Sequence, residues 1–371
     1  MMNNQTENSS DKPQAVQANS LCTCWDVRHS EHIEQQLSEA GQILANGGIV
    51  AFPTETVYGL GADARNTHAV ASVFTAKGRP SDNPLIVHIS HMDQLGSLVS
   101  EIRPLEQTLM DHFWPGPLTL VMPVRPDTVS PLVTAGLNTV AIRMPDHPIA
   151  LGLISASGCP LAAPSANRSG RPSPTTAAHV IEDLSAVIDG VVDGGSAGIG
   201  VESTVIQVQD DHTIMILRPG GITEEQLSSF AKQVIRDPAL QDSSLELTPR
   251  SPGMKYTHYA PQGSMTIVMG EHDEVVNQYI QQQIVQAQAR GEKTGILVFD
   301  ETNINSADTV VLSLGSRHSL AEAANRLYAA LRILDSEGVT FIMAQGCDQQ
   351  GVGVAVMNRL SKAAGGQIIY V

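Results

Sequence analysis

Prolines divide this chain into two parts. Between residues 236 and 262, Asp-Pro, Thr-Pro-Arg-Ser-Pro and Tyr-Ala-Pro follow one another with little hydrophobic periodicity between them. Proline has no amide hydrogen and a fixed φ, so such a segment cannot continue a helix or a central strand. We therefore expect an extended linker over 236–262. The full length of 371 residues is enough for one domain on each side of it.

Short apolar runs alternate with helical patterns on both sides of the linker. Before it we expect strands at 49–52, 85–89, 118–122 and 140–144, with helices at 32–46, 104–113, 148–157 and 176–184. After it, strand signals at 264–269, 294–299, 309–314, 339–343 and 368–371 alternate with helical ones. The pattern predicts an α/β domain with a mixed sheet over 25–235 and a small Rossmann-like α/β domain over 263–371. Residues 1–24 are predicted to be a disordered tail.

The composition excludes several classes of protein. The formal net charge is −16 and the sequence pI is near 5.1, which argues against tight non-specific nucleic-acid binding. The four cysteines are scattered and fit neither a zinc site nor a disulfide framework. No apolar run is long enough to span a membrane, and no signal peptide is evident. We therefore expect a cytoplasmic protein.

Standard nucleotide-binding motifs are missing from the sequence. No GxxxxGK[ST] loop occurs, and the glycine-rich stretch 195–200 lies between two predicted strands rather than at a helix start. We interpret that stretch as a mobile or tight turn.

Polar residues gather instead where predicted strands and helices end, which is where α/β proteins place ligand contacts. Residues 53–61, Pro-Thr-Glu-Thr-Val-Tyr-Gly-Leu-Gly, follow the first strand and favour a binding turn or, alternatively, a helix cap with a packed tyrosine. Lys77 and Arg79 flank a glycine at the end of a helix. They could clamp a polyphosphate or only cap the helix dipole.

Further clusters lie along the same domain. Arg143 interrupts an apolar strand, and a buried arginine needs an anionic partner, either a substrate carboxylate or a protein carboxylate. His88 also lies in an apolar strand, as a core residue or a ligand contact. The small and hydroxyl-bearing residues of 163–175 could admit a ligand or begin a helix. Residues 202–204 and 218–220 form a last pair of strand ends, or ordinary turns.

Taken in order, eight phrases resemble the YrdC-like family of threonylcarbamoyl-AMP synthases. They are FPTETVYGLG at 52–61, KGRP at 77–80, NPLIVHI at 83–89, WPGPLTL at 114–120, AIRMP at 141–145, APSANRSGRPSPT at 163–175, ESTV at 202–205 and LRPG at 217–220. The phrase YTHYAP at 256–261 and the domain after it are similar to the longer, two-domain type of this family. The resemblance implies a twisted mixed sheet around a central cavity, with the linker as a lid.

The same resemblance implies which residues form the site. Those expected around L-threonine are Thr56, Tyr58, His88, Arg143, Ala163 and Ser203. Those expected to hold ATP or the adenylate are Lys77, Arg79, Asn83, Thr139, Ser165, Asn167, Ser173, Arg218 and Tyr259 of the linker. Lys77 and Arg79 would also be catalytic, because they would stabilise charge on the phosphoryl oxygens together with a Mg2+ that accompanies ATP. The sequence identifies no metal-binding residues.

The implied reaction joins L-threonine, bicarbonate and ATP into threonylcarbamoyl-AMP and pyrophosphate, for threonylcarbamoyladenosine in tRNAs that read ANN codons. We hypothesise that the threonine amine forms a carbamate, whose oxygen attacks the α-phosphate. No general base is evident, so the acceleration would come mainly from positioning in a closed cavity. The product could be handed to the tRNA threonylcarbamoyl-transferase complex.

Two other interpretations compete with this one. A carbamoyl-transfer module of hydrogenase maturation would carry zinc-binding CxxC repeats, which this chain lacks. A non-catalytic module that binds double-stranded RNA or the ribosome is disfavoured by the negative net charge.

Overall fold

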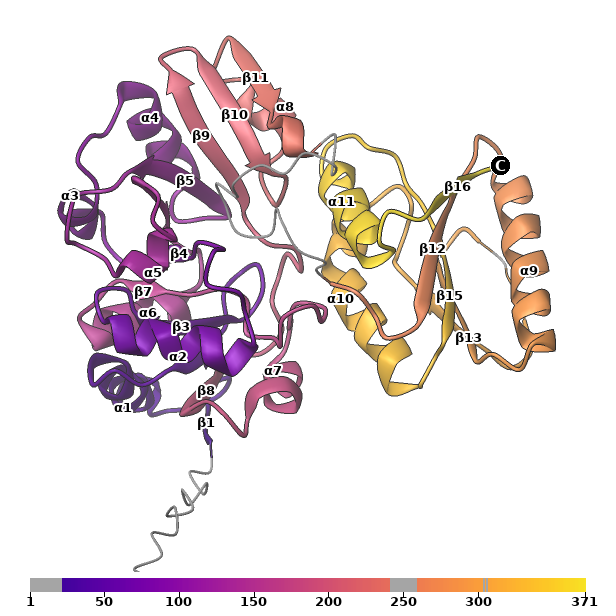
Figure 1. Ribbon diagram of the computed structural model, residues 1–371, viewed down its shortest axis with the longest axis horizontal. Coiled ribbons are helices and arrows are strands. Elements are labelled where there is room, and N and C mark those ends of the chain that lie inside the picture. Colours follow the sequence, from indigo (N-terminus) through magenta and orange to yellow (C-terminus); the bar gives the residue numbers. More distant parts are fainter. Residues whose placement is uncertain (1–21, 241–258, 303, 305) are drawn as a thin grey trace, which may run out of the picture.

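The computed structural model describes residues 22–240, 259–302, 304 and 306–371. These residues form two α/β domains, each built on its own sheet (Figure 1). Most of the predicted tail and most of the predicted linker, residues 1–21 and 241–258, lie outside the described residues. The first strand begins at Thr23, two residues inside the predicted tail, because Thr23 and Cys24 pair with Gly190 and Val191. No described helix is long and apolar enough to cross a membrane.

A mixed sheet forms the first domain. Among the described residues it has 11 strands in the order β1-β8-β2-β3-β7-β4-β6-β5-β9-β10-β11, with parallel and antiparallel pairs. Because this order differs from the order along the chain, strand ends that are far apart in sequence lie next to one another. The strands are β1 (Thr23–Asp26), β2 (Val50–Phe52), β3 (Gly59–Asp63), β4 (Ile86–His88), β5 (Leu118–Pro123), β6 (Thr139–Arg143), β7 (Leu161–Ala162), β8 (Gly190–Asp193), β9 (Thr204–Asp210), β10 (Thr213–Arg218) and β11 (Gln233–Arg236).

Helices cover both faces of this sheet. In β2, Val50 and Phe52 pack with the helices α1 and α6, whereas Ala51 between them packs with α2 and α7, as the alternation of side chains along a strand requires. The helices are α1 (Ile33–Ala45), α2 (Thr67–Lys77), α3 (Leu95–Leu98), α4 (Pro104–Phe113), α5 (Pro131–Thr134), α6 (Pro148–Ser157), α7 (Ala177–Leu184) and α8 (Glu224–Leu227), with 3-10 turns η1 (Met92–Gln94) and η2 (Pro238–Leu240).

Helix α2 shows how the local sequence positions a site residue. The Asn66 side chain caps its first turn by accepting hydrogen bonds from the amides of His68 and Ala69. The helix stops at Gly78, whose φ of 61° is the left-handed conformation that glycine adopts readily. Lys77 therefore lies in the last turn of α2, and its side chain is buried inside the first domain.

The second domain contains a parallel sheet with helices on both faces. Its described strands follow the order β14-β13-β15-β12-β16. Helix α9 (Asp273–Ala289) packs on one face, and α10 (Leu320–Ser336) and α11 (Gly353–Ala363) pack on the other, toward the first domain (Figure 1). The α/β class predicted for both domains is confirmed. The strands are β12 (Ser264–Met269), β13 (Thr294–Val298), β14 (Thr309–Ser313), β15 (Phe341–Gln345) and β16 (Ile368–Tyr370).

Strand β3 was not expected from the sequence. The glycine-rich residues after Pro53 read as a turn, yet Gly59–Asp63 pair antiparallel with β2. A Cβ on Gly61 would lie 2.8 Å from the ring of Phe52, so the strand needs glycine there to approach its neighbour. The same glycines remove the side-chain alternation by which a strand is recognised.

Candidate active site

A cavity lies where the ends of several strands of the first domain meet. It unites most of the residues predicted for the site, although they come from separate parts of the chain. The predicted residues that line it are Thr56, Arg79, His88, Arg143, Ala163, Ser165, Asn167, Ser203, Arg218 and Tyr259. A second cavity, between the domains, has both polar and apolar residues in its wall and contains none of the predicted residues.

Arg143, at the end of β6, is 3% exposed. Its Nη1 donates to Oγ1 of Thr56 at 2.9 Å, and its Nε donates to the Gly116 carbonyl at 3.3 Å. Its Nη2 lies 2.6 Å from Oε1 of Glu55. Of the two partners that the sequence left open, the protein carboxylate is therefore present in the structure. The guanidinium faces the cavity beside Thr56, whose Oγ1 lies 2.8 Å from Oγ1 of Thr54.

His88 lies in the cavity wall on the neighbouring strand, β4. Its Nδ1 is 3.2 Å from the Ile86 carbonyl. Burial and the nearby Arg143 lower the pKa of His88 from 6.5 to about 3. The imidazole is therefore neutral at physiological pH and is a weak proton acceptor.

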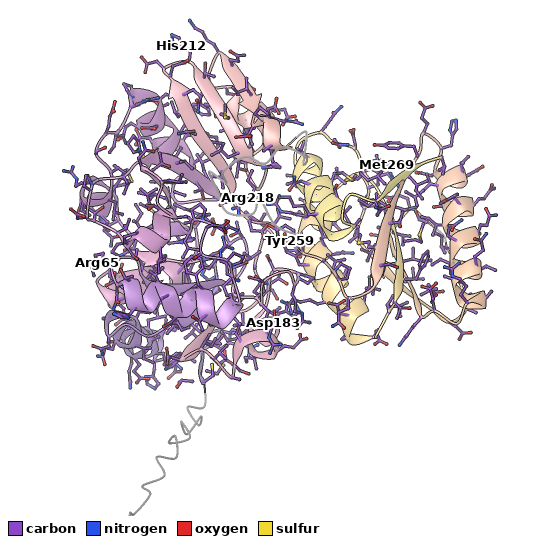
Figure 2. The ribbon with its side chains drawn as sticks, viewed as in Figure 1. Arg65, Asp183, His212, Arg218, Tyr259 and Met269 are labelled. Atoms are coloured by element: carbon purple, nitrogen blue, oxygen red, sulfur yellow. The ribbon has the colours of Figure 1, made fainter. Side chains whose placement is uncertain are left out.

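Arg218 and Tyr259 form the side of the cavity next to the second domain (Figure 2). Nη2 of Arg218 donates to the Ser203 carbonyl at 3.0 Å and to its Oγ at 3.1 Å. Tyr259 is 5% exposed, and its ring centre lies 5.1 Å from that of Tyr328 in α10. The last described part of the predicted linker thus reaches the cavity.

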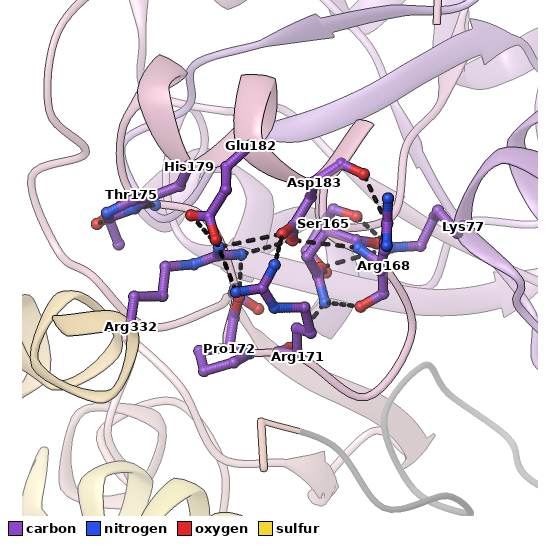
Figure 3. A network of polar contacts seen from close by, with 12 residues as sticks. Lys77, Ser165, Arg168, Arg171, Pro172, Thr175, His179, Glu182, Asp183 and Arg332 are labelled. Carbon is purple, nitrogen blue, oxygen red and sulfur yellow. Dashed lines mark hydrogen bonds and ion pairs between the residues drawn. The ribbon is translucent and has the colours of Figure 1, made fainter. Parts of the chain in front are cut away.

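Lys77 lies behind the cavity wall rather than in it. Its Nζ donates to the carbonyls of Ser165 and Asn167 at 2.5 and 2.6 Å, and it lies 3.4 Å from Oδ1 of Asn167 (Figure 3). Burial, and next the charge of Arg79, lower the pKa of Lys77 well below its ordinary value. The ammonium group therefore holds the loop that presents Ser165 and Asn167, both of which line the cavity.

The structure does not bring four other predicted residues to the cavity surface. Tyr58 points away from it, and its hydroxyl donates to the Gly195 carbonyl at 2.6 Å. Thr139 begins the strand that ends at Arg143, roughly 13 Å away at about 3.3 Å per residue. Ser173 is fully buried and bonds to Glu202 at 2.7 Å. Asn83 is fully buried, and in the described part of the chain neither atom of its side-chain amide has a hydrogen-bond partner.

Several cavity residues were not predicted. Glu202 directly precedes Ser203 in the ESTV phrase, and Thr54 lies in the same turn as Thr56. Their positions inside recognised phrases were the available signal, but nothing local showed that their side chains face the cavity. The unpredicted lining residues are Thr54, Val57, Gly59, Ile86, Pro164 and Glu202.

The described residues contain no group of three or more His, Cys, Asp or Glu side chains that could hold a metal ion. Glu202 is the only carboxylate among the described residues that line the cavity, and it is paired with Arg359. Glu55, in the adjoining turn, is paired with Arg143. The residues that the structure describes therefore do not fit a resident Mg2+ site.

Both domains of the chain match known proteins. Residues 42–220 match the family model of Sua5, YciO and YrdC proteins, described as "Telomere recombination", and residues 222–365 match "Threonylcarbamoyl-AMP synthase, C-terminal domain". The threonylcarbamoyl-AMP synthase of Bacillus subtilis is 52% identical over 91% of this chain and 95% of its own length. The threonylcarbamoyl-AMP synthase of Schizosaccharomyces pombe is 42% identical over 88% of this chain and 88% of its own length. Pyrococcus abyssi Sua5 complexed with L-threonine has a TM-score of 0.88 and 44% identity, covering 95% of this chain and all of that structure.

Proposed function

The chain belongs to the threonylcarbamoyl-AMP synthase family, and from this we propose that it makes threonylcarbamoyl-AMP and pyrophosphate from L-threonine, bicarbonate and ATP. The observation that carries the proposal is the buried Arg143 in a cavity that two further arginines, Arg79 and Arg218, also line. Such a cavity suits a substrate with a carboxylate at one end and a polyphosphate at the other.

We assign L-threonine to the side of the cavity formed by Thr56, His88 and Arg143. Guanidinium groups recognise carboxylates through paired hydrogen bonds. A neutral His88 adds a polar contact without a second positive charge in the same buried space. The similar Pyrococcus abyssi structure is a complex with L-threonine, which supports this substrate for the present chain.

We assign ATP to the side that contains Arg79 and Arg218. Both arginines line the cavity, and both suit the oxygens of a polyphosphate. Asn83 supports the assignment, because a buried amide without hydrogen-bond partners is rare in a native protein and calls for an explanation such as a bound ligand. Nη2 of Arg79 donates to the main-chain carbonyl of Asn83 at 3.5 Å, so Asn83 is next to a residue of this side.

In the proposed reaction the uncharged threonine amine adds to CO2 derived from bicarbonate, forms a C–N bond and loses one proton. The carbamate oxygen then bonds to the α-phosphorus of ATP while the bond to the leaving pyrophosphate breaks. Arg79 and Arg218 would stabilise charge on the phosphoryl oxygens, and Arg143 would orient the threonine. His88 is too weakly basic to be the general base, so positioning is the main contribution that we assign to the protein.

We place Mg2+ with ATP as part of the substrate, where phosphate oxygens supply its ligands. We further propose that the linker acts as a lid, since Tyr259 near its end lines the cavity. The reaction would take place in the cytoplasm. Its labile product would pass to the complex that completes threonylcarbamoyladenosine in tRNAs that read ANN codons.

Pyrophosphate release from ATP tests this proposal directly. We expect release that requires both L-threonine and bicarbonate, with L-serine a poor substitute. The Arg143→Lys variant should need much more threonine for the same rate. Arg65→Lys is the matched control, because the Arg65 guanidinium is half exposed, pairs with Asp63 and does not line the cavity. Release that ignores threonine would contradict the substrate assignment, and no release under any condition would favour a non-catalytic role.

A further inference from the structure

Glu202 is a buried carboxylate in the cavity wall, and residues of both domains bond to it. It is 7% exposed. Oγ of Ser173 donates to Oε1 at 2.7 Å, and the Tyr328 hydroxyl lies 3.0 and 2.9 Å from Oε1 and Oε2. Nε of Arg359 donates to Oε2 at 2.9 Å. A carboxylate with this many donors has a fixed position.

The second domain supplies two of these donors, Tyr328 from α10 and Arg359 from α11, and both side chains are fully buried. Burial alone would raise the pKa of Glu202, but Arg359 and then Arg218 outweigh it and lower the pKa to about 2. Burial and the Glu202 charge raise the pKa of Tyr328 well above its ordinary value. The Tyr328 hydroxyl therefore stays protonated and donates a hydrogen bond to the Glu202 carboxylate, which stays ionised.

Arg359 also joins two segments of the first domain. Its Nη1 donates to the Pro219 carbonyl at 2.9 Å while its Nε bonds to Glu202. The two segments touch, since a Cβ on Gly220 would lie 2.3 Å from the Glu202 carbonyl and 2.4 Å from the Thr204 amide. One guanidinium from the second domain thus fixes the start of β9 relative to the end of β10.

These two segments carry cavity residues. Ser203 directly follows Glu202, and Arg218 directly precedes Pro219. Arg218 and Ser203 line the cavity and bond to each other. Any shift of Glu202 or Pro219 would therefore move Arg218, which we assign to ATP.

From these contacts we propose that Tyr328 and Arg359 are positioning residues for the ATP side of the cavity and act through Glu202. The second domain thereby completes a site whose ligand-contacting residues are largely in the first. This inference rests on the proposed function, because it takes Arg218 to contact the nucleotide. It assigns a role to α10 and α11 that sequence comparison of the first domain alone does not suggest.

Two conservative variants of the full-length protein test the inference. Tyr328→Phe removes one hydroxyl but keeps the ring that packs on Tyr259, and Arg359→Lys keeps the charge but cannot bond to Glu202 and Pro219 together. We expect each to weaken equilibrium ATP binding by about five- to tenfold. This is less than the roughly 12- to 150-fold for losing a hydrogen bond to a charged group outright, because neither residue is assigned to touch the nucleotide. Threonine binding should change less than about twofold, because the partners of Arg143 among the described residues are Gly116, Thr56 and Glu55, none of which bonds to Glu202, Tyr328 or Arg359.

Glu225→Gln is the matched control. It also removes a carboxylate that touches the second domain, through the Gly351 amide at 3.4 Å, but Glu225 does not line the cavity. Its ATP binding should be unchanged. In addition, Tyr328→Phe should weaken ATP binding no further when combined with Glu202→Gln, because a residue that acts through Glu202 has nothing left to act on.

The possible results separate the two proposals. Variants that melt at a lower temperature but bind ATP as tightly as the wild type would show that the contacts only hold the domains together, which overturns the inference. Additive effects in the double variant would also overturn it. A wild-type protein that binds ATP but releases no threonine-dependent pyrophosphate contradicts the proposed function alone, and one that binds no ATP contradicts both. If Arg359→Lys does not fold, the double-variant comparison decides.

Discussion

Nη2 of Arg143 lies 2.6 Å from Oε1 of Glu55, so the cation assigned to the threonine carboxylate already has an anionic neighbour. A guanidinium has five N–H donors. Hydrogen bonds to Gly116 and Thr56 use one donor each on Nε and Nη1, whereas Nη2 lies in an ion pair with Glu55 and makes no hydrogen bond in the described part of the chain. The remaining hydrogens on the terminal nitrogens leave room for a second carboxylate. Glu55 thus orients Arg143 without using all of its donors.

Replacing Arg143 by lysine should therefore weaken threonine binding selectively. A lysine ammonium cannot bond to Glu55, Thr56 and a substrate carboxylate with the same planar geometry. Loss of charge-assisted hydrogen bonds of about 2–3 kcal/mol corresponds to roughly 30- to 150-fold in the KM for threonine. The KM for ATP should change by less than about threefold. Steady-state kinetics with each substrate varied in turn will measure both, and equal losses for the two substrates would contradict the assignment.

Lys77 should affect turnover more than threonine binding. Its ammonium fixes the carbonyls of Ser165 and Asn167, so Lys77→Met would release the loop on the ATP side. We expect turnover to fall by about 10- to 100-fold, the range for losing fixed positioning of a reactant, with threonine affinity within about threefold of wild type. Thr75→Met, on the exposed side of the same helix, is the control. Near-normal turnover in Lys77→Met would show that the reaction does not depend on the position in which Lys77 holds this loop.

His88 should make the protein less stable as the pH falls below 6.5. The pKa is about 3 in the folded protein and near 6.5 in the unfolded chain. Between these values the unfolded state binds a proton that the folded state excludes. The free energy of unfolding therefore falls by up to about 1.4 kcal/mol per pH unit from this group. The contribution is fully present above pH 6.5 and is lost as the pH falls toward 3.

The His88→Gln variant isolates this effect. Urea unfolding at pH 7.0, 6.0 and 5.0 should give a shallower decline for the variant than for the wild type. Burial lowers the pKa of His179 to about 4, so it contributes in the same direction, but it is present in both proteins and cancels in the comparison. Glu202 loses its stabilising charge only below about pH 4.5, outside this range. His68→Gln, on the exposed face of α2, should leave the slope unchanged.

The sequence predicted those features that depend on local chemistry. An arginine inside an apolar strand required a partner, and Arg143 has one in Glu55. Helix ends were also predictable, because Pro148 begins α6 and a glycine follows its end. Motif order further identified most of the residues that line the cavity.

What the sequence could not predict depends on contacts between distant segments. Tyr58 lies in a recognised phrase, yet its hydroxyl bonds to the Gly195 carbonyl rather than facing the cavity. Its orientation could not be predicted, because the glycines of the strand that follows it, β3, conceal that strand in the sequence. Glu202 bonds to Tyr328 and Arg359, which lie more than a hundred residues later in ordinary amphipathic helices. No local pattern distinguishes a buried tyrosine of a helix core from one that bonds across a domain boundary.

Gly200 should be essential to the contact between the domains for two reasons, its positive φ and its close approach to α10. Comparison with a second glycine separates these two effects. Its φ is 81°, and an added Cβ would lie 2.3 Å from Cα of Asn325 and 2.5 Å from the Ala324 carbonyl in α10. Gly136 has a φ of 79° but no atom within 4 Å of an added Cβ. Both alanine variants should lose about 1–2 kcal/mol through the left-handed conformation. Only Gly200→Ala also forces α10 away.

We therefore expect Gly200→Ala to lower the free energy of unfolding by at least about 2 kcal/mol more than Gly136→Ala, as backbone overpacking does. The same variant should raise the KM for threonine, because the Gly200 and Ile199 amides bond to the Thr56 and Glu55 carbonyls in the turn beside Arg143. Urea unfolding and threonine kinetics will measure the two effects. If both variants lose equal stability, α10 yields to the added methyl group. The second domain would then not hold this loop against the threonine side of the cavity.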